Sequence, residues 1–302
     1  MKLAVNTLIW AVDFTPAQLP LLRTLKEHGF EGVEIPVFDP ASFQAAAIRR
    51  GLDDNGLDCV ICSVMPPGFS LISDDAEVRA KSMQRLRNTI KVAADMGSKI
   101  VAGPIYCPVG YLPGRRRTPD EWKWAVESYQ SVVGDLESND VTLAIEPLNR
   151  FETYFLNTSA DLAVLCDDVG HRRVGASYDT FHSNIEDKDL GQSIRLLGSH
   201  IKHVQTCEND RGTPGSGHVE WDAVFAALRE IGYDQWLSIE SFAPNLGDFS
   251  SAVCIWRDIE PNTDNIAFDG IKFLLRKLGR ESHRAVKAHV REPVKQVERP
   301  NS

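Results

Sequence analysis

Residues 142–179 read TLAIEPLNRFETYFLNTSADLAVLCDDVGHRRVGASYD and contain the repeating unit of the chain. An apolar run that ends in Glu146 predicts a strand, and a second run that ends in Asp179 predicts the next strand. Between them, Thr158 is a suitable N-cap for a helix whose apolar residues begin after Asp161. A strand, a helix and a strand in this order predict a right-handed βαβ unit with parallel strands.

Eight apolar runs of this kind occur along the chain, and helical patterns separate them. We expect strands at residues 3–10, 32–37, 59–65, 99–106, 142–148, 174–179, 201–206 and 237–242. Continuous apolar runs are typical of parallel strands that are buried on both faces. Eight such strand-helix units predict a (β/α)8 TIM barrel, an α/β fold, rather than an open sheet.

The barrel pattern covers residues 1–279 as a single domain, and it stops there. Residues 280–302 contain six Arg or Lys against three Glu, two prolines and little apolar periodicity. We expect this C-terminal tail to be flexible or to contact a partner subunit.

Composition and charge exclude several classes of protein. Of the 302 residues, 43% are hydrophobic and 25% are charged, which is typical of a folded globular chain and not of a disordered one. The formal net charge of -9 disfavours nucleic acid and anionic membranes as partners. The first apolar run contains Asn6, so we interpret it as a strand and not as a signal peptide. Six scattered cysteines then indicate reduced thiols in the cytoplasm.

Four polar residues close successive predicted strands and are candidates for a shared site. They are Glu146, Asp179, Gln205 and Glu240, separated by 33, 26 and 35 residues. Each separation matches about one βα unit, and the active site of this fold lies at the carboxyl ends of the strands. We therefore expect the four side chains to converge.

Three carboxylates in one barrel mouth repel each other unless a positive charge neutralises them. A divalent cation held by Glu146, Asp179, Gln205 and Glu240 would do so, and oxygen ligands favour Mn2+ or Mg2+ over Zn2+. The alternative is that the acids pair with Arg or Lys inside the barrel.

Loop residues that follow the same strands extend the candidate site. His182 follows Asp179 and Arg211 follows Gln205, and we expect both to face the pocket. Glu152 follows Glu146, and the sequence leaves it open between a functional and a solvated side chain. We find no phosphate-binding loop, dinucleotide fingerprint or nucleophile elbow.

Several motifs resemble the group of D-tagatose 3-epimerase and D-psicose (D-allulose) 3-epimerase among the xylose-isomerase-like TIM barrels. The matching stretches are IEPLNRFE at 145–152, DTFH at 179–182, ENDRGTPGSGHVEW at 208–221, IESF at 239–242 and IWR at 255–257. The resemblance implies metal ligation by Glu146, Asp179 and Glu240, with Glu146 and Glu240 also serving as acid and base.

The same resemblance implies that Glu152, His182 and Arg211 bind the hydroxyls and the carbonyl end of the substrate. The chain departs from the family at one position, because Gln205 stands where the family usually has a metal-binding histidine. Gln205 can still offer an amide oxygen to a hard cation. We expect Mn2+, with Mg2+ or Co2+ as alternatives.

Together these features predict a metal-dependent sugar isomerase or epimerase, specifically a ketose 3-epimerase. The metal would stabilise an enediolate while Glu240 and Glu146 remove and return a proton on opposite faces. Two alternatives stay open. In the first, the same enolate supports β-elimination from a 3-oxo-C-glycoside by an enzyme that works with a small partner subunit. In the second, the barrel binds sugar without catalysis. We expect a small carbohydrate substrate and an oligomer, either of this chain alone or with that small subunit.

Overall fold

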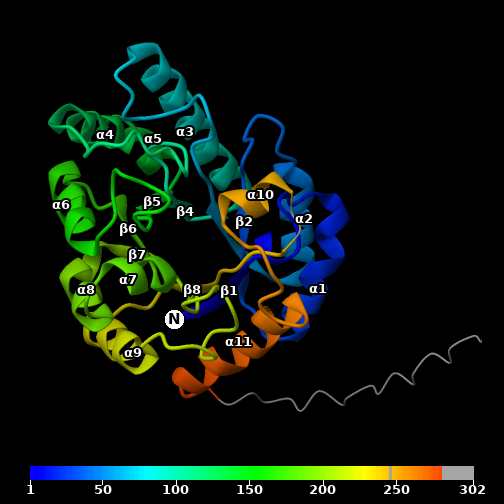
Figure 1. Cartoon of the computed structure of the whole chain (residues 1–302). Coiled ribbons are helices and arrows are strands. Elements are labelled where there is room, and N and C mark those ends of the chain that lie inside the picture. Colours follow the sequence, from blue (N-terminus) through cyan, green and yellow to red (C-terminus); the bar gives the residue numbers. More distant parts are fainter. Residues whose placement is uncertain (245–246, 281–302) are drawn as a thin grey trace, which may run out of the picture.

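The computed structural model describes residues 1–244 and 247–280, and eight parallel strands in it form a closed barrel in chain order. Each strand is hydrogen-bonded to the next, and β8 closes the ring against β1. Helices surround the barrel (Figure 1). The predicted (β/α)8 fold is confirmed. Apart from Arg280, the expected tail lies outside the described residues.

The strands and helices alternate along the chain. The strands are β1 (Lys2–Asn6), β2 (Gly32–Pro36), β3 (Asp58–Cys62), β4 (Ile100–Gly103), β5 (Thr142–Ile145), β6 (Val174–Asp179), β7 (Ile201–Gln205) and β8 (Trp236–Ile239). The α-helices are α1 (Leu19–Glu27), α2 (Ala45–Asn55), α3 (Ala76–Met96), α4 (Pro119–Ser131), α5 (Val133–Ser138), α6 (Ser159–Val169), α7 (Thr180–Glu186), α8 (Leu190–Leu197), α9 (Trp221–Glu230), α10 (Asp248–Ala252) and α11 (Thr263–Lys277). Short 3-10 turns are η1 (Thr7–Ile9), η2 (Pro16–Gln18) and η3 (Gly198–His200).

All eight predicted strands are present, but most end earlier than their apolar runs. β1 stops at Asn6 because that side chain accepts a hydrogen bond from the Leu8 N–H and caps η1. Pro104 follows β4 and Pro147 comes two residues after β5, and proline has no N–H to extend a ladder. The apolar residues beyond these ends belong to the loops that surround the barrel mouth.

Alternate residues of the strands pack on opposite sides of the barrel wall. Side chains such as Val33, Leu143 and Leu237 belong to the large core between the sheet and the helices. Ala4, Ala144 and their neighbours form a separate small cluster, as expected for residues that point into the barrel. Small side chains leave room inside the barrel for a few polar residues.

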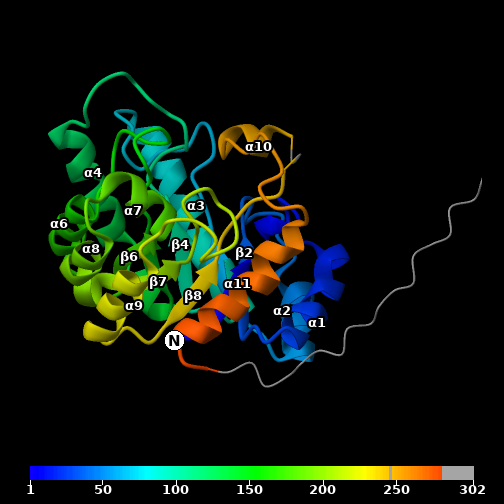
Figure 2. The same cartoon turned by 60° about the horizontal axis from the view of Figure 1, so that its bottom comes forward.

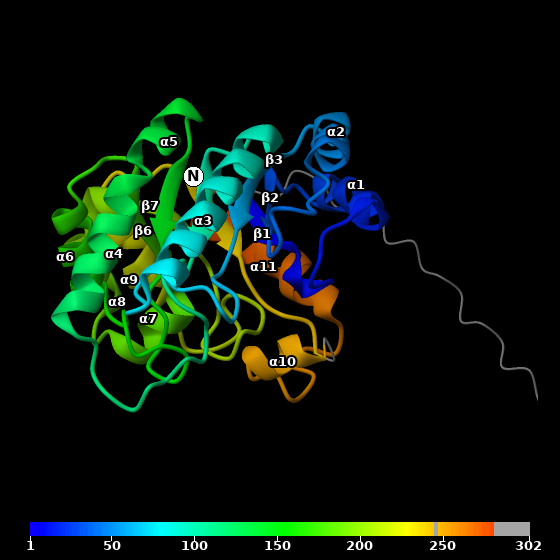
Figure 3. The ribbon, with the colours of Figure 1, turned by 90° about the horizontal axis from the view of Figure 1, so that it is seen from above.

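The loops that follow the strands gather at one end of the barrel. α10, which follows β8, lies at that end, and the N-terminus lies at the other end (Figures 2 and 3). This arrangement positions the site described below. Within the described residues, no helix combines the length and apolar character needed to cross a bilayer.

Candidate active site

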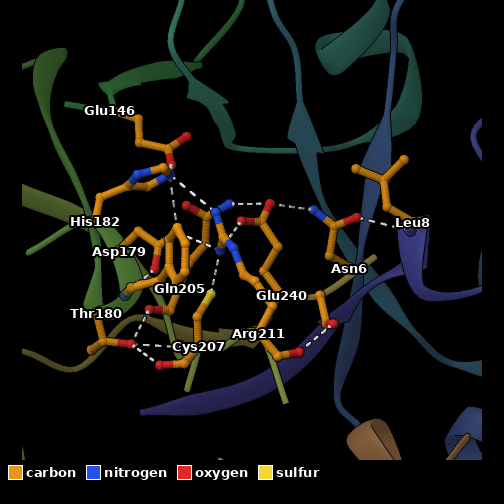
Figure 4. A network of polar contacts seen from close by, with 12 residues as sticks. Asn6, Leu8, Glu146, Asp179, Thr180, His182, Gln205, Cys207, Arg211 and Glu240 are labelled. Carbon is orange, nitrogen blue, oxygen red and sulfur yellow. Dashed lines mark hydrogen bonds and ion pairs between the residues drawn. The ribbon is translucent and has the colours of Figure 1, made fainter. Parts of the chain in front are cut away.

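The four residues selected by strand spacing lie together at the barrel mouth. Asp179 and Gln205 are the last residues of β6 and β7 and are paired in the sheet register. Glu146 and Glu240 come directly after β5 and β8. All four are buried, and Figure 4 shows them around one small volume. The structure thus brings together carboxylates that lie almost 100 residues apart in sequence.

Arg211 bridges two of these acids. Its Nη1 donates to Oδ2 of Asp179 at 2.8 Å and to Oε2 of Glu240 at 3.0 Å (Figure 4). The guanidinium carbon lies 4.0 Å from the ring centre of Phe181 and 5.0 Å from that of Phe242. Ion pairing with arginine, the alternative to a metal, is therefore present for Asp179 and Glu240.

The loop that carries Arg211 is fixed by a buried carboxylate. Glu208 accepts hydrogen bonds from the N–H groups of Gly215 and Val219 and from Nε1 of Trp221. Arg211 has a φ of +65°, which L-residues adopt at a cost, and Ser241 donates to its carbonyl oxygen. These contacts hold the loop in the conformation that directs the guanidinium inward.

His182 contributes a buried ring whose two nitrogens both lie against hydrogen-bond donors. Its Nδ1 accepts a hydrogen bond from the backbone N–H of Asn149 at 3.0 Å. Nε2 is 3.5 Å from Oε1 of Glu146 and 3.0 Å from Nη2 of Arg211. Burial lowers the pKa of His182, and the nearby positive charge of Arg211 acts in the same direction. The lowered pKa favours a neutral imidazole between Asn149 and Arg211.

Glu152 also lies at this pocket. Its Oε1 accepts a hydrogen bond from Nδ2 of Asn149 at 2.7 Å, and its side chain lines the same cavity as Glu146 and Glu240. Glu152 is partly exposed, unlike those two residues. Of the two interpretations that the sequence left open, the position of Glu152 favours a functional side chain.

The three acids of the candidate site have pKa values that differ from their usual ones. Burial, followed by repulsion from Glu240 and Asp179, raises the pKa of Glu146 well above its usual value. Burial also raises the pKa of Glu240, although Arg211 opposes this shift. Burial alone would raise the pKa of Asp179, but Arg211 and His182 together hold it below its usual value. Two carboxyl groups with raised pKa values beside one ionised carboxylate are suited to exchange protons.

The donor set fits a divalent metal ion. Three groups of buried side chains hold their ligand atoms within 4.8 Å of one another: Glu146, Asp179 and His182; Asp179, Cys207 and Glu240; and Glu34, Cys62 and Glu240. The three acids face a single buried guanidinium in the described residues, so negative charge exceeds positive charge. A divalent cation would neutralise the excess. A cation bound to Oδ2 of Asp179 and Oε2 of Glu240 would have to displace Arg211.

Gln205 presents its amide nitrogen to the acids. Nε2 donates to Oε1 of Glu34 at 2.9 Å and to Oε1 of Glu240 at 2.8 Å. Ligation of a metal through the amide oxygen, as expected from the sequence, would require this amide to turn over. Glu34 was not identified from the sequence, and a carboxylate within an otherwise apolar strand was the available signal.

Asn6 was also missed. It is the polar residue that ends β1, and its Nδ2 donates to Oε1 of Glu240 at 3.0 Å. The rule that selected the four other strand-terminal residues would have found it if the first strand had been predicted to stop at Asn6 rather than at Trp10.

A cavity of about 340 Å3 opens above these groups, which is at the small end of the usual range for ligand sites. Its base holds the polar residues Glu146, Glu152, His182, Arg211 and Glu240. Apolar side chains form the remaining wall, and they include Leu8, Phe38, Val64, Met65, Leu148, Phe242, Phe249 and Val253. The cavity can therefore hold a small molecule with its reactive end against the acids.

Comparison with known proteins identifies relatives along almost the whole chain. A probable ketose 3-epimerase of Synechocystis sp. is 33% identical over 274 residues, which are 91% of this chain and 96% of that protein. An L-ribulose 3-epimerase of Mesorhizobium japonicum is 32% identical over 88% of this chain and 90% of its own length. The crystal structure of a D-allulose 3-epimerase from Methylomonas sp. in complex with D-allulose superposes with a TM-score of 0.87, at 25% identity, over 92% of this chain and 97% of that one.

These relatives confirm the resemblance stated from the motifs, and they confirm an enzyme of the sugar epimerase and isomerase type. The family model described as "Xylose isomerase-like TIM barrel" matches residues 22–277. The match extends from within α1 to the end of α11 and includes every polar residue of the candidate site except Asn6. The chain belongs to the xylose isomerase-like TIM barrel family.

Proposed function

We propose that the protein is a metal-dependent ketose 3-epimerase in which Glu240 and Glu146 are the two acid–base groups. One observation carries the proposal. Two buried carboxyl groups, Glu146 after β5 and Glu240 after β8, line the same small cavity from strands that are not neighbours in the barrel. A substrate between them would present one face to each.

The reaction moves a proton that is difficult to remove. A carboxylate with a pKa near 4 must deprotonate a carbon acid that is weaker by about 15 pKa units, a gap of about 20 kcal/mol. Glu146 and Glu240 are the two buried carboxylates that line the cavity and could act as the bases. A divalent cation held by Glu146, Asp179 and Glu240 supplies Lewis-acid stabilisation of the negative charge that develops on the substrate.

Each residue then has a defined task. Glu240 removes the C3 proton on one face of the ketose, and Glu146 delivers a proton to C3 on the other face, which inverts the carbon. In the reverse direction the two exchange tasks. Arg211 donates hydrogen bonds to substrate oxygens, His182 hydrogen-bonds to a substrate hydroxyl, and Glu152 accepts from a hydroxyl. The apolar wall keeps water from the reacting carbon.

We expect Mn2+ as the native ion, with Mg2+ or Co2+ as alternatives, because carboxylate oxygens dominate the donor set. We also expect a cytoplasmic protein, since all six cysteines are free thiols. A homo-oligomer, or an assembly with a small subunit if the chain is a lyase, remains a prediction that sedimentation velocity tests.

Product analysis with two classes of substrate tests the proposed function. The protein is treated with EDTA, reloaded with Mn2+ and incubated with free ketohexoses or with 3-oxo-glycosides. We expect ketoses to interconvert at C3, with activity lost in EDTA and restored by Mn2+.

Other results would contradict the proposal. Absence of ketose interconversion in Mn2+ removes it, and release of an aglycone from the 3-oxo-glycoside would assign β-elimination instead. Binding of sugar without turnover, unaffected by EDTA, would assign a binding protein.

A further inference from the structure

A closed ring of hydrogen bonds lies beneath Glu240, deeper in the barrel. Asn6 Nδ2 donates to Oε1 of Glu34 at 3.2 Å and to Oε1 of Glu240 at 3.0 Å. Gln205 Nε2 donates to the same two oxygens at 2.9 and 2.8 Å. Two amides thus link two carboxylates, and all four residues are buried. Glu34 comes from β2 and is fully buried, and the reaction described above does not use it.

The chemistry of this ring fixes the orientation of Gln205. An ionised carboxylate can only accept hydrogen bonds, and the amide group of Gln205 contacts carboxylate oxygens on both sides. Turning the amide would place its oxygen less than 3 Å from one carboxylate oxygen of Glu34 and one of Glu240, and would lose both hydrogen bonds. The structure directs the amide oxygen toward the hydroxyl of Ser177 instead, at 3.5 Å.

The second oxygen of Glu34 is also engaged. Nε2 of His203 lies 2.9 Å from Oε2 of Glu34, and both side chains are fully buried. Nδ1 of His203 has no hydrogen-bond partner in the described residues. If Nε2 carries the ring proton, Glu34 receives hydrogen bonds from Asn6, Gln205 and His203. This arrangement gives Glu34 the geometry of a fixed acceptor and not of a group that exchanges protons with substrate.

We propose that Glu34 is a positioning residue that holds Gln205 and Asn6 as donors to Oε1 of Glu240, so that Gln205 orients this acid and does not ligate the metal. The inference rests on the proposed function. It gives Glu240 two unequal oxygens. Oε1 is fixed by the two amides, and Oε2, which Arg211 contacts, faces the cavity and the substrate.

A double-mutant cycle on Mn2+-loaded protein tests this role. Glu34→Met removes the acceptor and Gln205→Met removes the donor, both at nearly constant volume. We expect each to lower kcat by about 10- to 100-fold, the usual range for residues that orient a ligand or base, while KM changes by less than about threefold. Because both act through Glu240, the double variant should lose hardly more than either single variant.

Glu34→Asp and Glu121→Gln supply the controls. The aspartate keeps the charge and should recover part of kcat. Glu121 is a buried carboxylate outside the site that pairs with Arg115 and caps α4. Its replacement should therefore lower thermal stability without the loss of kcat.

A crystal structure of the wild-type protein with Mn2+ alone provides the readout that does not depend on activity or on the folding of a variant. We expect Nε2 of Gln205 to remain against Glu34 and Glu240. An amide oxygen within about 2.3 Å of the ion would overturn the inference, and so would multiplicative losses of kcat in the cycle. If the wild-type protein binds Mn2+ but interconverts no ketose, the proposed function fails, and the orientation of Gln205 is still decided by the structure.

Discussion

Replacing Arg211 with methionine should expose the competition between the guanidinium and a bound cation. Arg211 donates to Asp179 at 2.8 Å and to Glu240 at 3.0 Å, and all three side chains are buried. Removing one partner of a buried ion pair costs about 3–5 kcal/mol, because the other charge stays uncompensated. For a protein of this size each kcal/mol changes Tm by about 2–4 °C, so we expect a loss of about 6 °C or more in EDTA.

Manganese should reverse most of that loss. A cation bound by Asp179 and Glu240 takes over the compensation that Arg211 gives in the metal-free protein. Thermal melts of wild type and Arg211→Met in EDTA, and again in saturating Mn2+, measure the difference. We expect the difference in Tm between wild type and Arg211→Met to decrease by at least half when Mn2+ is present.

Arg23→Met provides the control, since Arg23 forms an ion pair with Glu27 and both side chains are largely exposed. Its loss should cost less than about 1 kcal/mol and should not respond to Mn2+. An equal gap for Arg211→Met in EDTA and in Mn2+ would show that no cation binds at these oxygens, and the reasoning would be refuted.

Three further predictions concern the acids and the thiols. Glu240→Gln and Glu146→Gln should each lower kcat about 100- to 10,000-fold, the usual contribution of an acid–base group. Because Glu240 is intact in Glu146→Gln, this variant should still exchange the C3 hydrogen of one epimer with solvent, as measured by NMR. Burial raises the pKa of Glu146 in the folded protein above its ordinary value of 4.5, so its contribution to stability is present at low pH and is lost as pH rises through the raised pKa. In EDTA, Glu146→Gln should therefore gain in Tm relative to wild type between pH 5 and pH 8, and a constant difference would contradict the raised pKa. Five cysteines are buried and Cys254 is exposed, so a thiol reagent should label one cysteine quickly in the native protein and all six after unfolding.

Strand spacing was sufficient to predict the fold and the convergence of four strand-terminal side chains at the barrel mouth. The βα period fixes which residues reach the barrel mouth, so Asp179 and Gln205 could be placed side by side from residue counts alone. The strand ends were less predictable, because the apolar runs continue past Pro104 and Pro147 into loops. The side chains of these loops are buried around the barrel mouth, although the residues form no strand. Hydrophobic periodicity reports burial and not hydrogen-bond pairing.

The roles of Arg211 and Gln205 could not be derived from local patterns. Arg211 reaches the acids because Glu208 folds its loop and the backbone accepts a positive φ, and both depend on tertiary contacts. The amide of Gln205 is oriented by Glu34, which lies 171 residues earlier in the chain and on another strand of the barrel. Contacts across the interior of a closed barrel join residues whose distance in sequence gives no sign of their proximity.

The central claim is that two carboxylates on opposite faces transfer the C3 proton of a ketose with the help of a divalent cation. Isotope exchange tests it most directly. A ketose is equilibrated in D2O with Mn2+-loaded protein, and both epimers are analysed by NMR. The account predicts that the epimerised product carries one solvent deuteron at C3, and that EDTA abolishes its incorporation. An epimerised product that retains the substrate hydrogen at C3, or incorporation that continues unchanged in EDTA, would contradict it.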